Sequence, residues 1–149
     1  ELAWCCDLRI LGEGSAFGQP EVLLGIIPGG GATQRLTRLV GRATAKRLIW
    51  GGAAVKAAEA LALGLADEVV GDDEILDRAC ALAAGYAAGP RVAIRAAKRA
   101  IDGGVDMTLA DGVDLELELF LEVFETNDAR VGVESFFEHG PGKAHFTGS

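Results

Sequence analysis

The sequence has few of the residues and patterns that mark several common classes of protein. Its three cysteines, Cys5, Cys6 and Cys80, form no Cys-x-x-Cys pair, and an odd number fits no disulfide framework. We therefore expect a reduced, cytoplasmic setting. No uninterrupted apolar run reaches the length of a membrane span, and no signal-peptide pattern heads the chain, so we expect no membrane partner.

Basic charge is also scarce. Fourteen lysines and arginines stand against 22 acidic residues, which gives a net charge of −8. A nucleic-acid surface is normally basic, so this balance argues against a nucleic-acid partner. The two histidines, His139 and His145, have no cysteine or acidic ligand at metal spacing. We expect no metal site.

The known nucleotide-binding loops are missing from the stretch around which the chain is organised, FGQPEVLLGIIPGGGATQRL at residues 17–36. A phosphate loop needs Lys-Ser/Thr after its last glycine, and here Ala32 follows Gly31. The dinucleotide pattern fails because Gln34 replaces its last Gly or Ala. The glycines at 29–31 remain open to two interpretations. They form either a plain turn into a helix or a pocket wall beside a polar helix end.

Several separated motifs fall in order at the spacing of one known family. They are Glu1 to Ala3, Cys6-Asp7, Phe17 to Glu21, Leu24-Gly25, Ile27 to Gly29, Gly31 to Leu36, Gly64 to Val70, Met107 to Leu109 and Asn127 to Arg130. Together they resemble the enoyl-CoA hydratase/isomerase (crotonase) family over nearly the whole chain. The sequence opens inside a family motif, so the resemblance suggests the C-terminal portion of a longer enzyme.

The resemblance implies a catalytic pair of glutamates. Glu1 matches the family residue that activates water, and Glu21 matches the residue that delivers a proton to C2 of a 2-enoyl-CoA thioester. Hydration needs one group to accept a proton and another to donate one. Family isomerases usually keep only the counterpart of Glu21, so the pair favours a hydratase. An isomerase-type member and a catalytically silent fragment that self-associates through helices stay open as alternatives.

Other site residues follow from the same resemblance. Gly29, Gly30 and Gly31 are expected to form the pocket wall beneath the substrate's α carbon. Trp50 is expected either to line the acyl pocket or to pack in the core. Lys143 lies where the family places basic tail residues near the adenine end of coenzyme A, although the preceding Gly-Pro-Gly departs from the usual tail. No cofactor is expected, because coenzyme A is part of the substrate.

A further group of basic residues has helical spacing. Arg35, Arg38, Arg42 and Lys46 recur every three or four residues. This face would either meet the phosphates of coenzyme A or simply be solvated, and the solvated interpretation is the more common one for such a pattern.

The expected fold is α/β. Residues 1–71 would form the end of a crotonase-like ββα spiral that carries the catalytic glutamates. They should contain short strands at 8–11, 15–18 and 66–70 and helices at 1–6, 32–40, 43–50 and 56–63. Residues 72–149 would be all-helical, with helices at 74–87, 91–102 and 108–125 and a final one near 127–138. Asp72 and Asp73 are expected to cap the first of these helices, and Thr108 the third. Two apolar faces on the 108–125 helix suggest an oligomerisation region, as in family members that form a homotrimer or a hexamer.

Overall fold

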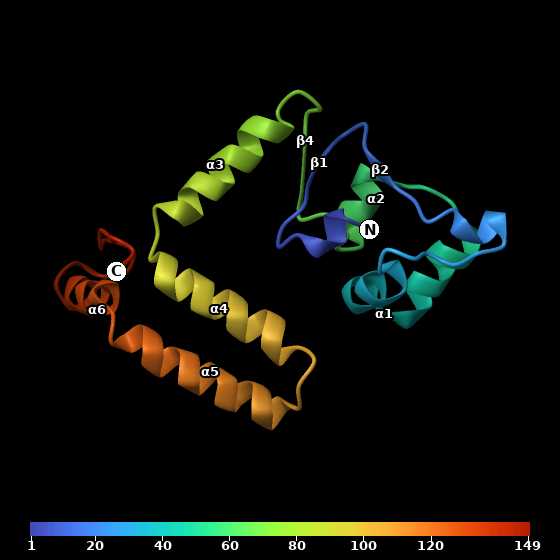
Figure 1. Ribbon diagram of the computed structural model, residues 1–149. Coiled ribbons are helices and arrows are strands. Elements are labelled where there is room, and N and C mark those ends of the chain that lie inside the picture. Colours follow the sequence, from blue (N-terminus) through green and yellow to red (C-terminus); the bar gives the residue numbers. More distant parts are fainter. The chain divides into compact units, whose positions relative to one another are not determined.

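The computed structural model describes all residues from 1 to 149, which divide into two compact units, Glu1–Cys80 and Ala81–Ser149 (Figure 1). The sequence placed the boundary after residue 71. In the structure it falls within helix α3 (Ile75–Ala87) instead. We describe each unit separately.

Short strands of the first unit pair in two separate ribbons. Strand β1 (Ile10–Gly12) pairs in parallel with β4 (Glu68–Val70), and β2 (Ala16–Phe17) pairs antiparallel with β3 (Val55–Lys56). The strands predicted at 8–11, 15–18 and 66–70 are present with shifted ends. Strand β3 was not predicted, because two residues are too few to show an alternating pattern.

Helices of the same unit lie close to their predicted positions, except for the short turn at residues 21–24, which was not predicted. Two are 3-10 turns, η1 (Ala3–Cys5) and η2 (Glu21–Leu24), and two are α-helices, α1 (Ala32–Gly51) and α2 (Ala57–Ala62). Gly41 interrupts α1 with φ 75° and ψ 164°, which is a conformation that suits only glycine. The prediction of two helical segments separated at Gly41 is confirmed.

A single apolar cluster holds these elements together. Leu36 of α1 and Leu65 after α2 are the largest fully buried side chains, and the Trp4 ring of η1 packs beside them with its centroid 5.3 Å from that of Phe17. The helical faces therefore cover the short strands with apolar side chains, which is the main source of stability for so small a core.

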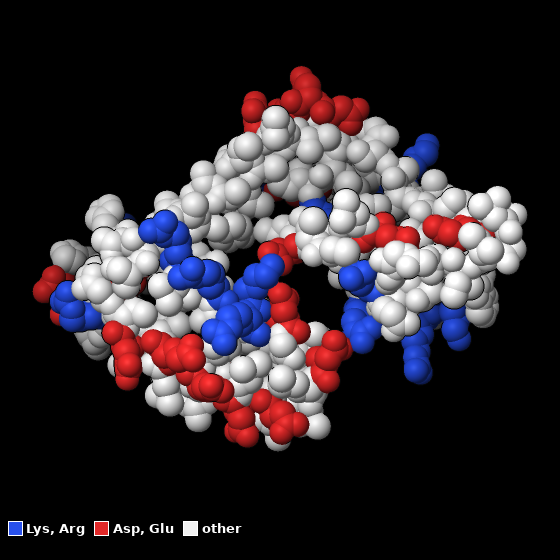
Figure 2. Space-filling model, viewed as in Figure 1, with Lys and Arg blue, Asp and Glu red and all other residues white.

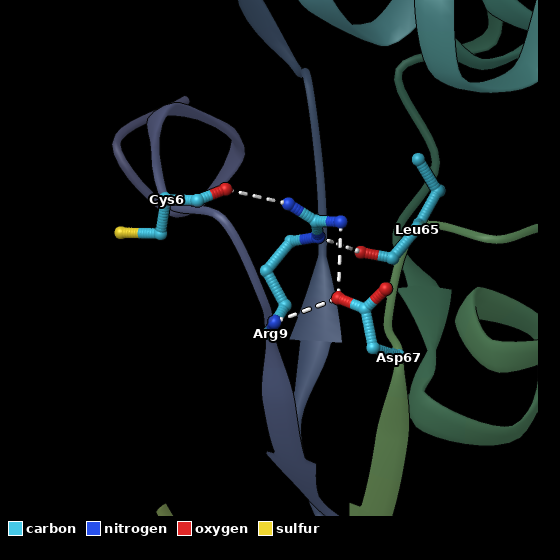
Figure 3. Close-up of polar contacts among 4 residues, drawn as sticks. All are labelled: Cys6, Arg9, Leu65 and Asp67. Atoms are coloured by element: carbon cyan, nitrogen blue, oxygen red, sulfur yellow. Dashed lines mark hydrogen bonds and ion pairs between the residues drawn. The ribbon is translucent and has the colours of Figure 1, made fainter. Parts of the chain in front are cut away.

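One arginine links the segment before β1 to the segment before β4 (Figure 3). The guanidinium of Arg9 donates to the carbonyl oxygens of Leu65 at 3.1 Å and Cys6 at 2.9 Å, and its Nη2 lies 3.0 Å from Asp67 Oδ2. The Arg9 backbone N–H donates to the same carboxylate at 2.7 Å. Its side chain is only 9% exposed, so the carboxylate and the two carbonyls satisfy a charge that water reaches poorly.

The second unit is helical, as predicted. After α3 come α4 (Arg91–Gly104), α5 (Leu109–Phe124) and α6 (Asn127–His139). Helices α4 and α5 pack against each other, and basic side chains over α4 adjoin acidic ones over α5 (Figures 1 and 2). Thr108 caps α5 as predicted, since its hydroxyl oxygen accepts from the Asp111 N–H at 3.2 Å.

The last residues of the chain fasten onto the start of α6. The buried Asp128 carboxylate accepts hydrogen bonds from the backbone N–H groups of Thr147 at 2.8 Å and Gly148 at 2.7 Å. Arg91 donates to the Thr147 carbonyl oxygen at 2.8 Å. Donation by the Thr147 N–H is the largest of the influences that lower the pKa of Asp128, with Gly148, the Thr147 hydroxyl and the charge of Arg91 acting in the same direction against burial.

None of the helices combines the length and the apolar character that a membrane crossing needs.

Candidate active site

Glu1 is held by the backbone at the start of helix α1. The Gly30 N–H lies 3.0 and 2.9 Å from the two oxygens of the Glu1 carboxylate, and the Ala32 N–H donates to Glu1 Oε1 at 2.9 Å. The first N–H groups of a helix have no partner within it, so a carboxylate there satisfies them. The Gly-rich stretch therefore forms a cradle for the first predicted catalytic residue.

Two glycines make this close approach possible. A Cβ at Gly30 would lie 2.5 Å from Glu1 Oε2 and 3.2 Å from Glu1 Cβ, which is closer than side chains normally come. Gly31 has φ 109°, and a Cβ there would collide with the Arg35 guanidinium. Gly29 differs, because a Cβ there would meet nothing within 4 Å. Only Gly30 and Gly31 are required by the local geometry.

Arg35 also contacts this loop through its guanidinium group. Its Nη1 donates to the Gly30 carbonyl oxygen at 2.9 Å. The sequence grouped Arg35 with a solvated basic face, and its role at the loop was missed. The signal for it was its position one helical turn after the glycines, where a long side chain can reach back to the preceding carbonyl.

Glu21 occupies the first position of η2, at the far end of the segment that leads to the glycines. The side chain is half-buried, and its Oε2 atom is buried without any hydrogen-bond partner in the protein. An unpartnered buried carboxylate oxygen is costly, and natural proteins keep few of them. The oxygen is therefore a candidate for contact with a ligand.

The remaining predicted residues, Trp50 and Lys143, have exposed side chains. Trp50 is 70% exposed on α1, with Lys46 Nζ 5.6 Å from its ring centroid, so the alternative of core packing is wrong. Lys143 is exposed in the segment after α6. No group of three or more His, Cys, Asp or Glu side chains is placed to hold a metal ion.

Comparisons with known proteins identify the family. The family model described as enoyl-CoA hydratase/isomerase matches residues 1–149. A short-chain-enoyl-CoA hydratase of Clostridioides difficile is 46% identical over 136 residues, which are 91% of this chain and 88% of the relative. The enoyl-CoA hydratase of Bacillus anthracis superposes with a TM-score of 0.92 at 36% identity, covering 99% of this chain and 57% of that one. The chain belongs to the enoyl-CoA hydratase/isomerase family and has its crotonase-like α/β fold.

The overlap with other relatives is partial in length. A Bacillus subtilis protein named as a putative enoyl-CoA hydratase/isomerase is 43% identical over 93% of this chain, and the match takes in 53% of that relative. This chain spans about half the length of several curated relatives. The predicted family is confirmed. The findings do not support its placement as the C-terminal portion of a longer enzyme.

Proposed function

We propose that the protein is an enoyl-CoA hydratase, which adds water in the syn sense to a 2-trans-enoyl-CoA thioester and yields a 3-hydroxyacyl-CoA. The names of its relatives support this substrate class. The observation that carries the proposal is the contrast between the two glutamates. One is fixed on the glycine cradle, and the other keeps a buried oxygen without a partner.

Glu1 is the proposed base. An ionised carboxylate offers about four acceptor sites, and the three contacts from Gly30 and Ala32 leave about one for a water molecule. The Glu1 carboxylate accepts a proton from that water as the oxygen attacks C3 of the enoyl group. Its fixed orientation removes the need to order the base during the reaction.

Glu21 is the proposed acid. Attack at C3 leaves negative charge on C2 and the thioester oxygen, and the Glu21 carboxyl delivers a proton to C2. Its unpartnered Oε2 is the atom that would face the substrate. One proton leaves water and one reaches C2, so the reaction adds the elements of water and nothing else. Coenzyme A takes part as a portion of the substrate, and we propose no further cofactor.

The pocket residues complete the proposal. Gly29, Gly30 and Gly31 line the space beneath the substrate's α carbon. Trp50 offers an exposed aromatic face for the acyl group, and Lys143 offers an exposed ammonium group to the phosphates at the adenine end of coenzyme A. The geometry around Glu1 supports the first of these assignments most directly.

The test compares three matched substitutions in the intact protein. Glu1→Gln and Glu21→Gln each remove one proton carrier, and we expect kcat for hydration of a short 2-enoyl-CoA to fall by about 10²- to 10⁴-fold. Glu13→Gln is the control, because Glu13 is exposed in the turn between β1 and β2. Double-bond migration without hydration in the unmodified protein would instead favour the isomerase-type alternative.

Self-association is a second candidate function, which the outer face of α5 favours. Its apolar side chains are more than half exposed: Val113, Leu117, Phe120, Leu121 and Phe124. Leu119 of the same helix is only 3% exposed. An apolar face of this extent is typical of a subunit interface, and we propose a homotrimer, or a hexamer built from two trimers, with residues 72–149 supplying the contacts.

Sedimentation equilibrium tests this interface. Leu117→Lys should lower the molar mass of the assembly while leaving the helical circular dichroism intact, because Leu117 faces outward. A Leu119→Ala variant is the contrast, since loss of a buried leucine should reduce stability by about 2–5 kcal/mol. A monomer in the unmodified protein, or an unchanged mass for Leu117→Lys, would exclude the proposed interface.

The cellular setting stays a prediction. Cys5, Cys6 and Cys80 are free and exposed. A cytoplasmic protein should keep them as thiols, so a thiol titration of freshly purified protein under denaturing conditions should count three. A lower count, restored by a reducing agent, would contradict the prediction.

A further inference from the structure

Two residues of the first unit that carry a buried polar atom without a partner line the same small cavity. Trp4 Nε1 and Gln19 Oε1 have no hydrogen-bond partner in the protein, and both residues are only 6% exposed. Both residues line this cavity. One of the two atoms is a donor and the other is an acceptor.

The size of the cavity fits one water molecule. The space open to the centre of a water-sized sphere is about 10 Å³, close to the smallest volume that holds a water. Apolar side chains form much of the lining, including Phe17, Leu36 and Leu65. These walls offer no polar side-chain atom to either Trp4 or Gln19, so an unbridged pair would carry the full cost of desolvation.

We propose that a single internal water molecule binds in this cavity and bridges Trp4 Nε1 to Gln19 Oε1. The water accepts a hydrogen bond from the indole N–H and donates one to the side-chain carbonyl oxygen of Gln19. This arrangement satisfies both buried atoms, and bridging waters of this kind behave as part of the protein structure.

The position of the water gives it a structural role at the site. Trp4 lies in η1, three residues after Glu1, and Gln19 lies two residues before Glu21. The water would therefore form hydrogen bonds to both of the segments that carry the glutamates. That it positions the glutamates for catalysis rests on the proposed function, whereas its presence does not.

The first experiment observes the water directly by NMR of protein labelled with ¹⁵N at the indole nitrogen. The protein has two tryptophans, and Trp50, at 70% exposed, is the internal control. Trp50→Phe assigns the two signals. We expect the Trp4 indole proton to exchange slowly and to show NOE and ROE cross-peaks to water of opposite sign, which indicate a long-lived bound water. Slow exchange without a water cross-peak would indicate a direct bond and overturn the proposal.

The second experiment measures coupling between the two side chains. Trp4→Phe and Gln19→Met each remove one partner of the water, and the double variant removes both. We expect the double variant to lose less stability in urea than the sum of the two single losses, because each single variant leaves the other polar atom unsatisfied. Strictly additive losses would contradict the bridge.

A third comparison separates this inference from the proposed function. If Glu1→Gln and Glu21→Gln hydrate the enoyl-CoA substrate as fast as the unmodified protein and the Trp4 water cross-peak is present, the proposed function is refuted and the bound water is supported. If both variants lose hydratase activity and the unmodified protein shows no water cross-peak, the proposed function is supported and the bound water is refuted.

Discussion

The contact between Gly30 and Glu1 leads to a prediction that separates catalysis from folding. Gly30→Ala places a Cβ 2.5 Å from Glu1 Oε2 and 2.9 Å from Glu1 Cδ, whereas ordinary contacts begin at 3.4 Å. The carboxylate must therefore move by about 1 Å, and a misplacement of that size costs about 100-fold in rate. Because the Glu1 carboxylate is the flexible end of a side chain, the fold should persist with a loss of about 1–2 kcal/mol from weakened hydrogen bonds.

The neighbouring glycine supplies a matched control. Gly29→Ala adds the same methyl group one residue earlier, where nothing lies within 4 Å and φ is not positive. It leaves the contacts of the Glu1 carboxylate untouched, so kcat should fall far less than in Gly30→Ala, and stability should stay level or rise by up to about 1 kcal/mol because the unfolded chain loses freedom.

The assay follows the loss of the conjugated enoyl thioester absorbance, with urea unfolding of each variant alongside. Equal hydration rates for Gly30→Ala and the unmodified protein would show that the cradle does not position the base. An equal loss of hydration rate in both variants would show that any methyl group in this loop lowers the rate by stiffening the backbone.

Three further predictions concern interactions outside the Glu1 cradle. Arg9→Met should destabilise the first unit by about 1–3 kcal/mol in urea unfolding, because the Arg9 side chain is only 9% exposed. Arg47→Met is the control: it breaks the ion pair with Glu59, in which Arg47 is 61% exposed, and should change stability by less than about 0.5 kcal/mol. Similar losses of stability in the two variants would refute the distinction between a buried and an exposed pair. Gly41→Ala should cost about 1–3 kcal/mol, since φ is 75° with no neighbour within 4 Å, and an unchanged midpoint would contradict strain as the cause. The Thr147 N–H holds the pKa of Asp128 below its ordinary value of 3.8. The ionised Asp128 carboxylate therefore contributes its full stabilisation above pH 3.8, and this stabilisation is lost as the pH falls through the lower pKa of the folded state. Asp128→Asn should flatten this acid dependence, and an unchanged slope below pH ~4 would exclude it.

Features that depend on neighbouring residues were predicted well. The break at Gly41 and the Thr108 cap follow from the conformational range of glycine and from the reach of a threonine side chain to the N–H three residues on. The outer apolar face of α5 was visible from helical spacing, as was the second face that carries Leu119. Each signal lies within one or two helical turns, where sequence spacing fixes distance.

Features that depend on residues far apart in the sequence were not predicted. Asp72 was expected to cap α3, but its Oδ1 accepts from the Gly14 N–H at 2.9 Å, 58 positions away. The Glu1 carboxylate finds its donors 29 and 31 positions along the chain. A resemblance named Glu1 as a site residue. Nothing local indicated that Gly30 and Ala32 hold it, because tertiary packing alone brings these segments together.

The parallel pairing of β1 with β4 also bears on the order in which the protein acquires structure. Ile10 pairs with Glu68, and Arg9 with Asp67, so closing this contact fixes a loop of about 58 residues at an entropic cost of roughly 3–4 kcal/mol. Neighbouring helices such as α4 and α5 need no such closure and can pair soon after both have been made. During synthesis, β1 emerges among the first residues of this segment and finds its partner strand only after Val70 has followed.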